Sequence, residues 1–132
     1  MSEGPQLTDE QVAFLNDVVD LARAGEAATV ADYVDRGVPV DLTNANGDTL
    51  LILAAYHEHL ELARALLERR ADPDRVNDRG QTALVAAVFR QHAPIVEALL
   101  AAGADPDLGG PDARATAAYF QLPEMTALLS RS

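Results

Sequence analysis

The sequence lacks three residue types that often mark chemistry or cellular compartment. Among its 132 residues there is no Cys, no Trp and no Lys, so all 10 basic residues are Arg. The absence of cysteine excludes disulfides, thiolate metal sites and cysteine nucleophiles. Serine occurs only at positions 2, 130 and 132, which excludes a serine triad built inside a fold. No apolar stretch approaches the roughly 20 residues that a membrane span requires, so no membrane-spanning segment is predicted.

Positive charge is also scarce. Asp and Glu number 21 against 10 Lys and Arg, which gives a formal net charge of -11 at pH 7. Such an acidic surface argues against nucleic acid or anionic membranes as partners. It is compatible with a basic protein partner, and also with a simple role in solubility. Residues 1–6 contain no basic region followed by an apolar run, so no secretory signal is predicted and we expect a cytoplasmic protein.

A block that occurs twice dominates the chain. Residues 44–55 read N-A-N-G-D-T-L-L-I-L-A-A, and residues 77–88 read N-D-R-G-Q-T-A-L-V-A-A-V. Gly47 and Gly80 lie 33 positions apart, and the other matching residues keep the same spacing. A fixed period of about 20 to 50 residues is typical of a stacked repeat array. One such repeat cannot bury its own apolar face, so the array needs neighbours and soluble ends.

The two copies resemble the ankyrin-repeat family. The family pattern is D-x-x-G-x-T-P-L-H-x-A-A-x-x-G-H, followed by a second helix that ends in L-L-x-x-G-A-D-x-N. This chain has N-A-N-G-D-T-L-L-I-L-A-A-Y-H-E-H and N-D-R-G-Q-T-A-L-V-A-A-V-F-R-Q-H at the same places. The resemblance implies an all-α solenoid of helix-turn-helix units joined by hairpin loops, which serves as a binding surface. Ile52 and Val85 replace the family's His, which leaves apolar side chains near the loops.

We expect a single domain of about four repeats, two of them degenerate caps. The divisions are a tail at 1–7, an N-terminal capping repeat at 8–43, repeats at 44–76 and 77–109, and a shortened C-terminal capping repeat at 110–132. The helices expected from apolar spacing and flanking turn residues cover 8–24, 27–35, 50–57, 60–69, 83–90, 93–102, 113–120 and 124–129.

Helix boundaries can be predicted from local residue types. Thr8 and Gln11 form a capping-box pattern, and Thr49 and Thr82 stand where a hydroxyl can cap the next helix. Arg70 occupies the position that Gly103 holds one repeat later, after the second helix. If the backbone is left-handed there, a residue other than glycine costs about 1 kcal/mol or more.

The resemblance implies that a partner binds in a concave groove, which the hairpin tips and the exposed side of the first helices form. Tyr56, Phe89 and Phe120 occupy equivalent positions in successive repeats, which predicts a row of aromatic rings. Aromatic residues and Arg dominate binding energy at protein interfaces. The alternative is that the rings only cover seams between helices. The candidate partner-binding residues are Asn46, Asp48, Ile52, Tyr56, His57, Asp78, Arg79, Gln81, Val85, Phe89, Arg90 and Phe120.

The three histidines give little indication of a metal-binding site. His59 and His92 stand at the turn position of the family pattern, which favours a structural role. His57 and His59 could form a pair of ligands, but no carboxylate is placed with them in the sequence. No metal site, cofactor or catalytic residue is therefore predicted.

Three function hypotheses remain open. The leading one is a non-enzymatic, monomeric protein-protein interaction module that acts as an adaptor, an accessory factor or an inhibitor. The second is an acidic inhibitor, similar to an antitoxin, that masks a basic nucleic-acid-binding partner, and the net charge of -11 supports it. The third is a self-associating structural subunit whose apolar groove closes on a second copy.

Overall fold

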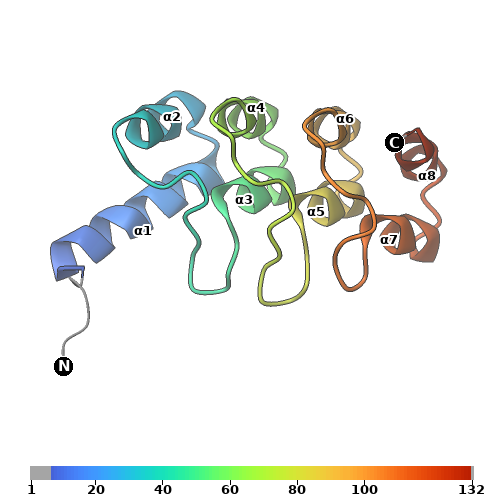
Figure 1. Cartoon of the computed structure of the whole chain (residues 1–132), viewed down its shortest axis with the longest axis horizontal. Helices are drawn as coiled ribbons and strands as arrows, with labels where there is room; N and C mark the ends of the chain where they lie inside the picture. The colour runs from blue at the N-terminus through green and yellow to red at the C-terminus, as the bar shows by residue number, and fades with distance from the viewer. Residues whose placement is uncertain (1–6, 132) are drawn as a thin grey trace.

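Eight helices in two layers make up the part of the chain that the structure describes, residues 7–131 of a computed structural model. Residues 1–6 of the expected tail lie outside it. The first helix of each pair lies in one layer and the second helix in the other, and the pairs follow one another along a single direction (Figure 1). The helices are α1 Asp9–Ala24, α2 Ala27–Asp35, α3 Leu50–Tyr56, α4 Leu60–Glu68, α5 Ala83–Phe89, α6 Ala93–Ala101, α7 Ala113–Tyr119 and α8 Pro123–Ser130.

The expected all-α solenoid of helix-turn-helix units is confirmed. Among residues 7–131 the extended pairing is limited to two isolated bridges, Thr43 with Thr49 and Gly109 with Asp112. Each observed helix lies within one residue of its predicted bounds. The first helices of the two matching copies end at Tyr56 and Phe89, one residue earlier than predicted. In the same part of the chain, no helix is long and apolar enough to span a lipid bilayer.

Side-chain caps start the first helix of every repeated unit. The capping box of α1 is present: the Gln11 amide donates to Thr8 Oγ1 at 3.1 Å, and the Thr8 amide donates to Gln11 Oε1 at 2.8 Å. Thr49 and Thr82 each accept from the backbone amide three residues further on, at 3.0 and 3.1 Å. Asp112 caps α7 in the same way, at 2.7 Å. These bonds satisfy amides that have no partner within the helix.

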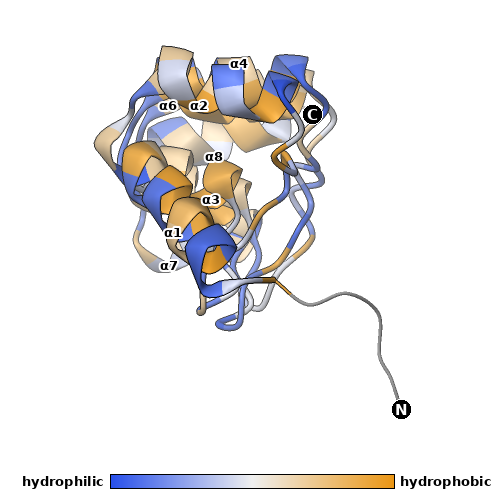
Figure 2. Ribbon diagram, turned by 90° about the vertical axis from the view of Figure 1, so that its left-hand side faces the viewer, coloured by the Kyte–Doolittle hydropathy of each residue, from blue (hydrophilic) through white to orange (hydrophobic). Residues whose placement is uncertain are grey.

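The core lies between the two layers and along the row of first helices. Six of the seven residues of α3 are buried, and so are six of the seven residues of α5. Ala54 and Ala87 are fully buried, and their small side chains let neighbouring helices approach closely. Leu62, Leu66 and Leu99 of the second helices fill the space between the layers. Figure 2 shows α3 coloured as hydrophobic, whereas the outer turns of α4 and the loops contain hydrophilic segments.

The turns repeat a left-handed backbone at fixed places. Arg70 has φ 68° after α4, and Gly103 has φ 93° at the equivalent place after α6. Arg70 therefore adopts the left-handed conformation that glycine has in the next repeat. This conformation brings the Cβ of any residue but glycine too close to the following carbonyl oxygen. The same conformation occurs between the two helices of each pair, at Gly25, Glu58, Gln91 and Gln121.

Two opposite substitutions test the cost of a left-handed backbone at a residue other than glycine. Arg70→Gly should raise the free energy of unfolding, and Gly103→Ala should lower it, each by about 1 kcal/mol. A Cβ added at Gly103 would meet no atom within 4 Å, so the loss would come from the backbone alone. Urea denaturation of both variants measures the two changes. A destabilised Arg70→Gly variant would show that the Arg70 side chain contributes more than its backbone costs.

Candidate functional site

Three long loops project beyond the layer of first helices (Figure 1). Most of the candidate residues lie on these loops or at the ends of the helices that follow them. We call one surface the loop–helix face: it comprises the hairpin tips at 44–48 and 77–81 together with the exposed C-terminal ends of α3, α5 and α7. The tips are joined through their backbones, because the Asp78 amide donates to the Asn46 carbonyl at 3.0 Å and the Gly110 amide donates to the Gly80 carbonyl at 2.9 Å.

Two asparagines hold the hairpins in shape. Asn44 Oδ1 accepts from the backbone amides of Asn46 and Asp48, both at 2.9 Å. One repeat later, Asn77 Oδ1 accepts from the equivalent amides, also at 2.9 Å. The Asn77 side chain donates to Asp48 Oδ1 of the preceding hairpin at 2.7 Å, and to Gln81 Oε1 at 3.1 Å. Asn77 therefore fixes its own loop and bonds it to the neighbouring one.

Four aromatic side chains are exposed on the loop–helix face. Tyr56, Phe89 and Phe120 are 40%, 46% and 50% exposed. The rings of Phe89 and Phe120 meet edge to face, with 5.5 Å between their centroids. Tyr119, which is 80% exposed, also meets Phe120 edge to face, with 4.9 Å between the ring centroids. The Arg90 guanidinium lies 5.5 Å from the centre of the Tyr56 ring, a distance typical of a cation–π contact.

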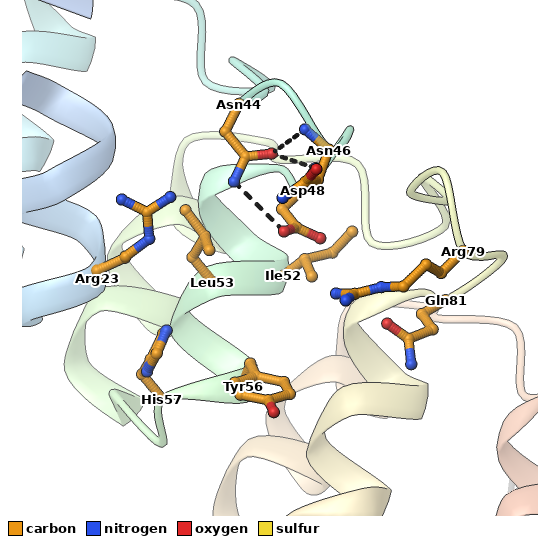
Figure 3. A pocket seen from close by; sticks show the side chains of 10 residues that line it. All are labelled: Arg23, Asn44, Asn46, Asp48, Ile52, Leu53, Tyr56, His57, Arg79 and Gln81. Atoms are coloured by element: carbon orange, nitrogen blue, oxygen red, sulfur yellow. Dashed lines mark hydrogen bonds between the residues drawn. The ribbon is translucent and has the colours of Figure 1, made fainter. Parts of the chain in front are cut away.

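A pocket of about 240 Å³ lies at the end of this face nearer the N-terminus. It is formed by the end of α1, by α3 and by the two hairpin tips (Figure 3). The Arg79 side chain extends from the second hairpin towards Ile52 and Tyr56 of α3. The residues that line the pocket are Arg23, Asn44, Asn46, Asp48, Ile52, Leu53, Tyr56, His57, Arg79 and Gln81.

Comparison with known proteins identifies the repeats. A family description of ankyrin repeats, in three copies, matches residues 19–109. The chain belongs to the ankyrin-repeat family. It is also 40% identical over 63 residues to an ankyrin repeat protein of Pseudomonas aeruginosa. That match covers 48% of this chain and 37% of the relative, so the chain spans well under half the length of the protein that it matches. Ankyrin repeats are generally protein-protein interaction modules without enzymatic activity.

Three of the candidate binding residues of this ankyrin-repeat chain are buried. Asp48 is 7% exposed, and Ile52 and Val85 are each 3% exposed. The expectation that these side chains are exposed to a partner is therefore wrong. Ile52 and Val85 lie in the first turn of α3 and α5, and both side chains belong to the apolar core. The other candidates with surface exposure are Asn46, Tyr56, His57, Asp78, Arg79, Gln81, Phe89, Arg90 and Phe120.

Sequence reasoning missed Asn77, Arg23 and Tyr119. Asn77 had a usable signal, since Asn opens both copies of the repeat three residues before the glycine. Tyr119 was also visible, because it directly precedes the predicted Phe120. Arg23 had no signal, because its place in the pocket depends on how α1 stacks against α3.

The histidines of the ankyrin turns have different bonding partners. His59 Nε2 lies 2.7 Å from the Arg23 carbonyl oxygen in the last turn of α1, so it bridges two repeats. His92 Nδ1 accepts from the Ile95 amide at 3.4 Å and caps its own helix. Among residues 7–131, no three His, Asp or Glu side chains come together in a way that could hold a metal ion.

Partial burial of the His57 ring lowers the pKa of this histidine below its usual value. The positive charges of His59, Arg23 and Arg90 lower this pKa further, whereas Asp48 opposes them. The imidazole of His57 is therefore mostly neutral at pH 7. Protonation favours the unfolded chain, whose His57 has the higher pKa, so this group lowers stability as the pH falls below about 6.5.

Asn77 bonds its own hairpin to the preceding one, so a substitution of Asn77 tests how much these bonds stabilise the fold. Asn77→Ala should lower the free energy of unfolding by about 2–3 kcal/mol, because it leaves Asp48 Oδ1 and the backbone amides of Arg79 and Gln81 without their partners. Asn46→Ala is the matched control and should change stability by about 0.5 kcal/mol or less, since the Asn46 side chain is exposed. Urea unfolding measures both variants. Equal losses in the two variants would contradict a bridging role for Asn77.

Proposed function

We propose that this ankyrin-repeat protein binds a protein partner through the loop–helix face and carries out no catalysis of its own. The observation that supports the proposal is the group of exposed aromatic rings. The chain contains six aromatic residues, and four of them, Tyr56, Phe89, Tyr119 and Phe120, belong to this group. Contiguous exposed apolar side chains often mark interaction sites, and aromatic residues supply much of the binding energy there.

The rigid hairpins support the same proposal. A surface that is already ordered before binding loses little conformational entropy when the partner arrives. The bonds from Asn77 to Asp48 and Gln81, and the backbone bond from Asp78 to Asn46, order this surface in the unbound protein. We therefore infer that the exposed side chains of the tips, Asp78, Arg79 and Gln81 among them, contact the partner directly.

The proposal includes the setting of the interaction. We place the protein in the cytoplasm as a monomer, with the capping repeats at 8–43 and 110–132 closing the two ends of the array. Adaptor, accessory factor and inhibitor all agree with such a binding surface. The formal net charge of -11 favours a partner that is basic overall. If that partner binds nucleic acid, this chain would act as its acidic inhibitor. Nucleic acid and membranes are not proposed as partners.

A double variant tests the aromatic rings. Phe89→Ala/Phe120→Ala should abolish retention of the partner in an affinity capture from native lysate, because it removes the edge-to-face pair. The same variant should lose only about 1–2 kcal/mol of stability, since both rings are half exposed. Arg64→Ala, an exposed change on α4, is the control and should retain the partner.

Three results would contradict the proposal or change it. A partner that the double variant keeps would place binding elsewhere. If salt alone then releases that partner, the acidic surface binds it and the inhibitor hypothesis is favoured. A stability loss far above the expected range would show that the rings belong to the core, and a dimer by light scattering at tens of micromolar would favour self-association.

A further inference from the structure

We propose that the pocket lined by Arg79 is a subsite for a carboxylate group, presented by an Asp or Glu side chain of the bound protein. The inference deepens the proposed function, because the carboxylate would belong to the same partner that contacts the aromatic rings. It differs from what the overall charge suggests, since the chain as a whole is strongly acidic. The argument depends on the donors and acceptors that line this one pocket.

Arg79 is the central donor. Its guanidinium points into the pocket in Figure 3, towards Ile52 and Tyr56. Within residues 7–131, no carboxylate lies at salt-bridge distance from it, whereas Arg90 is paired with Glu58 at 2.8 Å and Arg114 with Asp107 at 2.9 Å. A guanidinium presents five N–H groups in a planar fork that matches the two oxygens of a carboxylate.

The acidic group in the pocket has hydrogen-bond partners of its own. Asp48 lines the pocket, but its oxygens accept from Asn77 Nδ2 at 2.7 Å and from Asn44 Nδ2 at 3.3 Å. Both donors are neutral amides that belong to the hairpin framework. Asp48 is buried and forms no salt bridge with Arg79, so the guanidinium N–H groups remain available to a ligand, although the Asp48 charge itself is not neutralised by these amides.

Other unpaired donors surround the same space. Gln81 accepts from Asn77 through Oε1, which leaves its NH2 group without a partner in the described part of the chain. Arg23 donates to Asp20 through Nη1 at 2.6 Å, and its remaining N–H groups have no partner among residues 7–131. The Tyr56 hydroxyl is likewise unpaired within those residues. The pocket therefore offers several free hydrogen-bond donors, and two of its lining residues, Arg23 and Arg79, carry positive charge.

The size and the walls of the pocket fit a side chain. Its volume of about 240 Å³ is below the roughly 300–1,000 Å³ that is usual for pockets that hold drug-sized ligands. The exposed Tyr56 ring supplies an apolar wall, and Ile52 and Leu53 add only the small exposed parts that they retain, 3% and 5%. A short methylene stem could lie against that wall while the carboxylate meets Arg79, as Glu or Asp would allow.

His57 should make the binding depend on pH. Its imidazole lines the pocket, and the charged or titratable groups that act on it are His59, Arg23, Arg90 and Asp48. A bound carboxylate favours the protonated imidazole and so raises the pKa of His57. By linkage, the affinity should rise as the pH falls from 8 to about 5.5, above the range in which a Glu carboxylate itself is protonated. His57→Gln should remove most of this rise.

The test uses small probes and needs no partner. The 15N-labelled full chain is titrated with Nα-acetylglutamate amide up to tens of millimolar, and with the neutral Nα-acetylglutamine amide as the paired probe. We expect saturable shifts at the Arg79 Nε–H and at the backbone amides of 78–81 with the glutamate probe only. Arg79→Gln should weaken this binding about tenfold, as expected for the loss of a charge-assisted hydrogen bond. Arg75→Gln, an exposed Arg paired with Asp72 at 3.6 Å, should leave it unchanged.

Several outcomes would overturn the inference. They are the absence of saturable shifts with the glutamate probe, equal shifts with the glutamine probe, and equal effects of Arg79→Gln and Arg75→Gln. Inorganic phosphate is titrated in parallel, and binding at much lower concentrations than the glutamate probe would assign the pocket to a phosphoryl group instead. The amide spectrum of Arg79→Gln confirms that the variant is folded. Because no partner is present, a failed titration removes only the subsite, whereas the capture experiment with Phe89 and Phe120 decides the proposed function separately.

Discussion

Each helix pair of this chain has an apolar face that it cannot bury alone, and contact with the next pair removes that face from water. The seam between α3 and α5 shows the constraint most clearly. Six of the seven residues in each of these two short helices are buried, so neither helix has a polar face towards solvent. The side chains at the seam are small where helices meet and branched where the layers meet. Isolated helices of seven residues would not be stable in water, so their existence depends on this stacking.

The stacking also decides where the loops lie. Successive pairs are related by a constant step along the array, so equivalent positions of neighbouring hairpins come side by side. That is why Asn77 reaches Asp48 and why the Asp78 amide reaches the Asn46 carbonyl. These bonds in turn satisfy polar groups that the hairpins bury, including the Asp48 carboxylate. Helix packing and loop order therefore support each other, and the loop–helix face is ordered before any partner is bound.

The loop–helix face has two chemically different ends. Towards the C-terminus the rings of Phe89, Tyr119 and Phe120 form an exposed apolar surface. Towards the N-terminus, Arg79 lies in a pocket whose free groups are mostly donors. A partner that covered both ends would need an apolar segment beside an acidic side chain. Such a local requirement is compatible with a partner that is basic overall, because the net charge acts at long range and the pocket acts at contact distance.

Local patterns in the sequence determined the helix caps at Thr8, Thr49 and Thr82, because each cap joins groups three residues apart. Comparison of the chain with itself determined the period of 33 residues. Alignment of the repeats also placed Tyr56, Phe89 and Phe120 at one equivalent position. The same reasoning was wrong about Ile52 and Val85, because burial depends on tertiary packing and not on helical spacing. Only the tertiary structure decided that Asn77 bonds to Asp48, 29 positions earlier, and that Arg23 and Arg79 line one pocket. Those contacts join different repeats, and their geometry exists only once the helices have stacked.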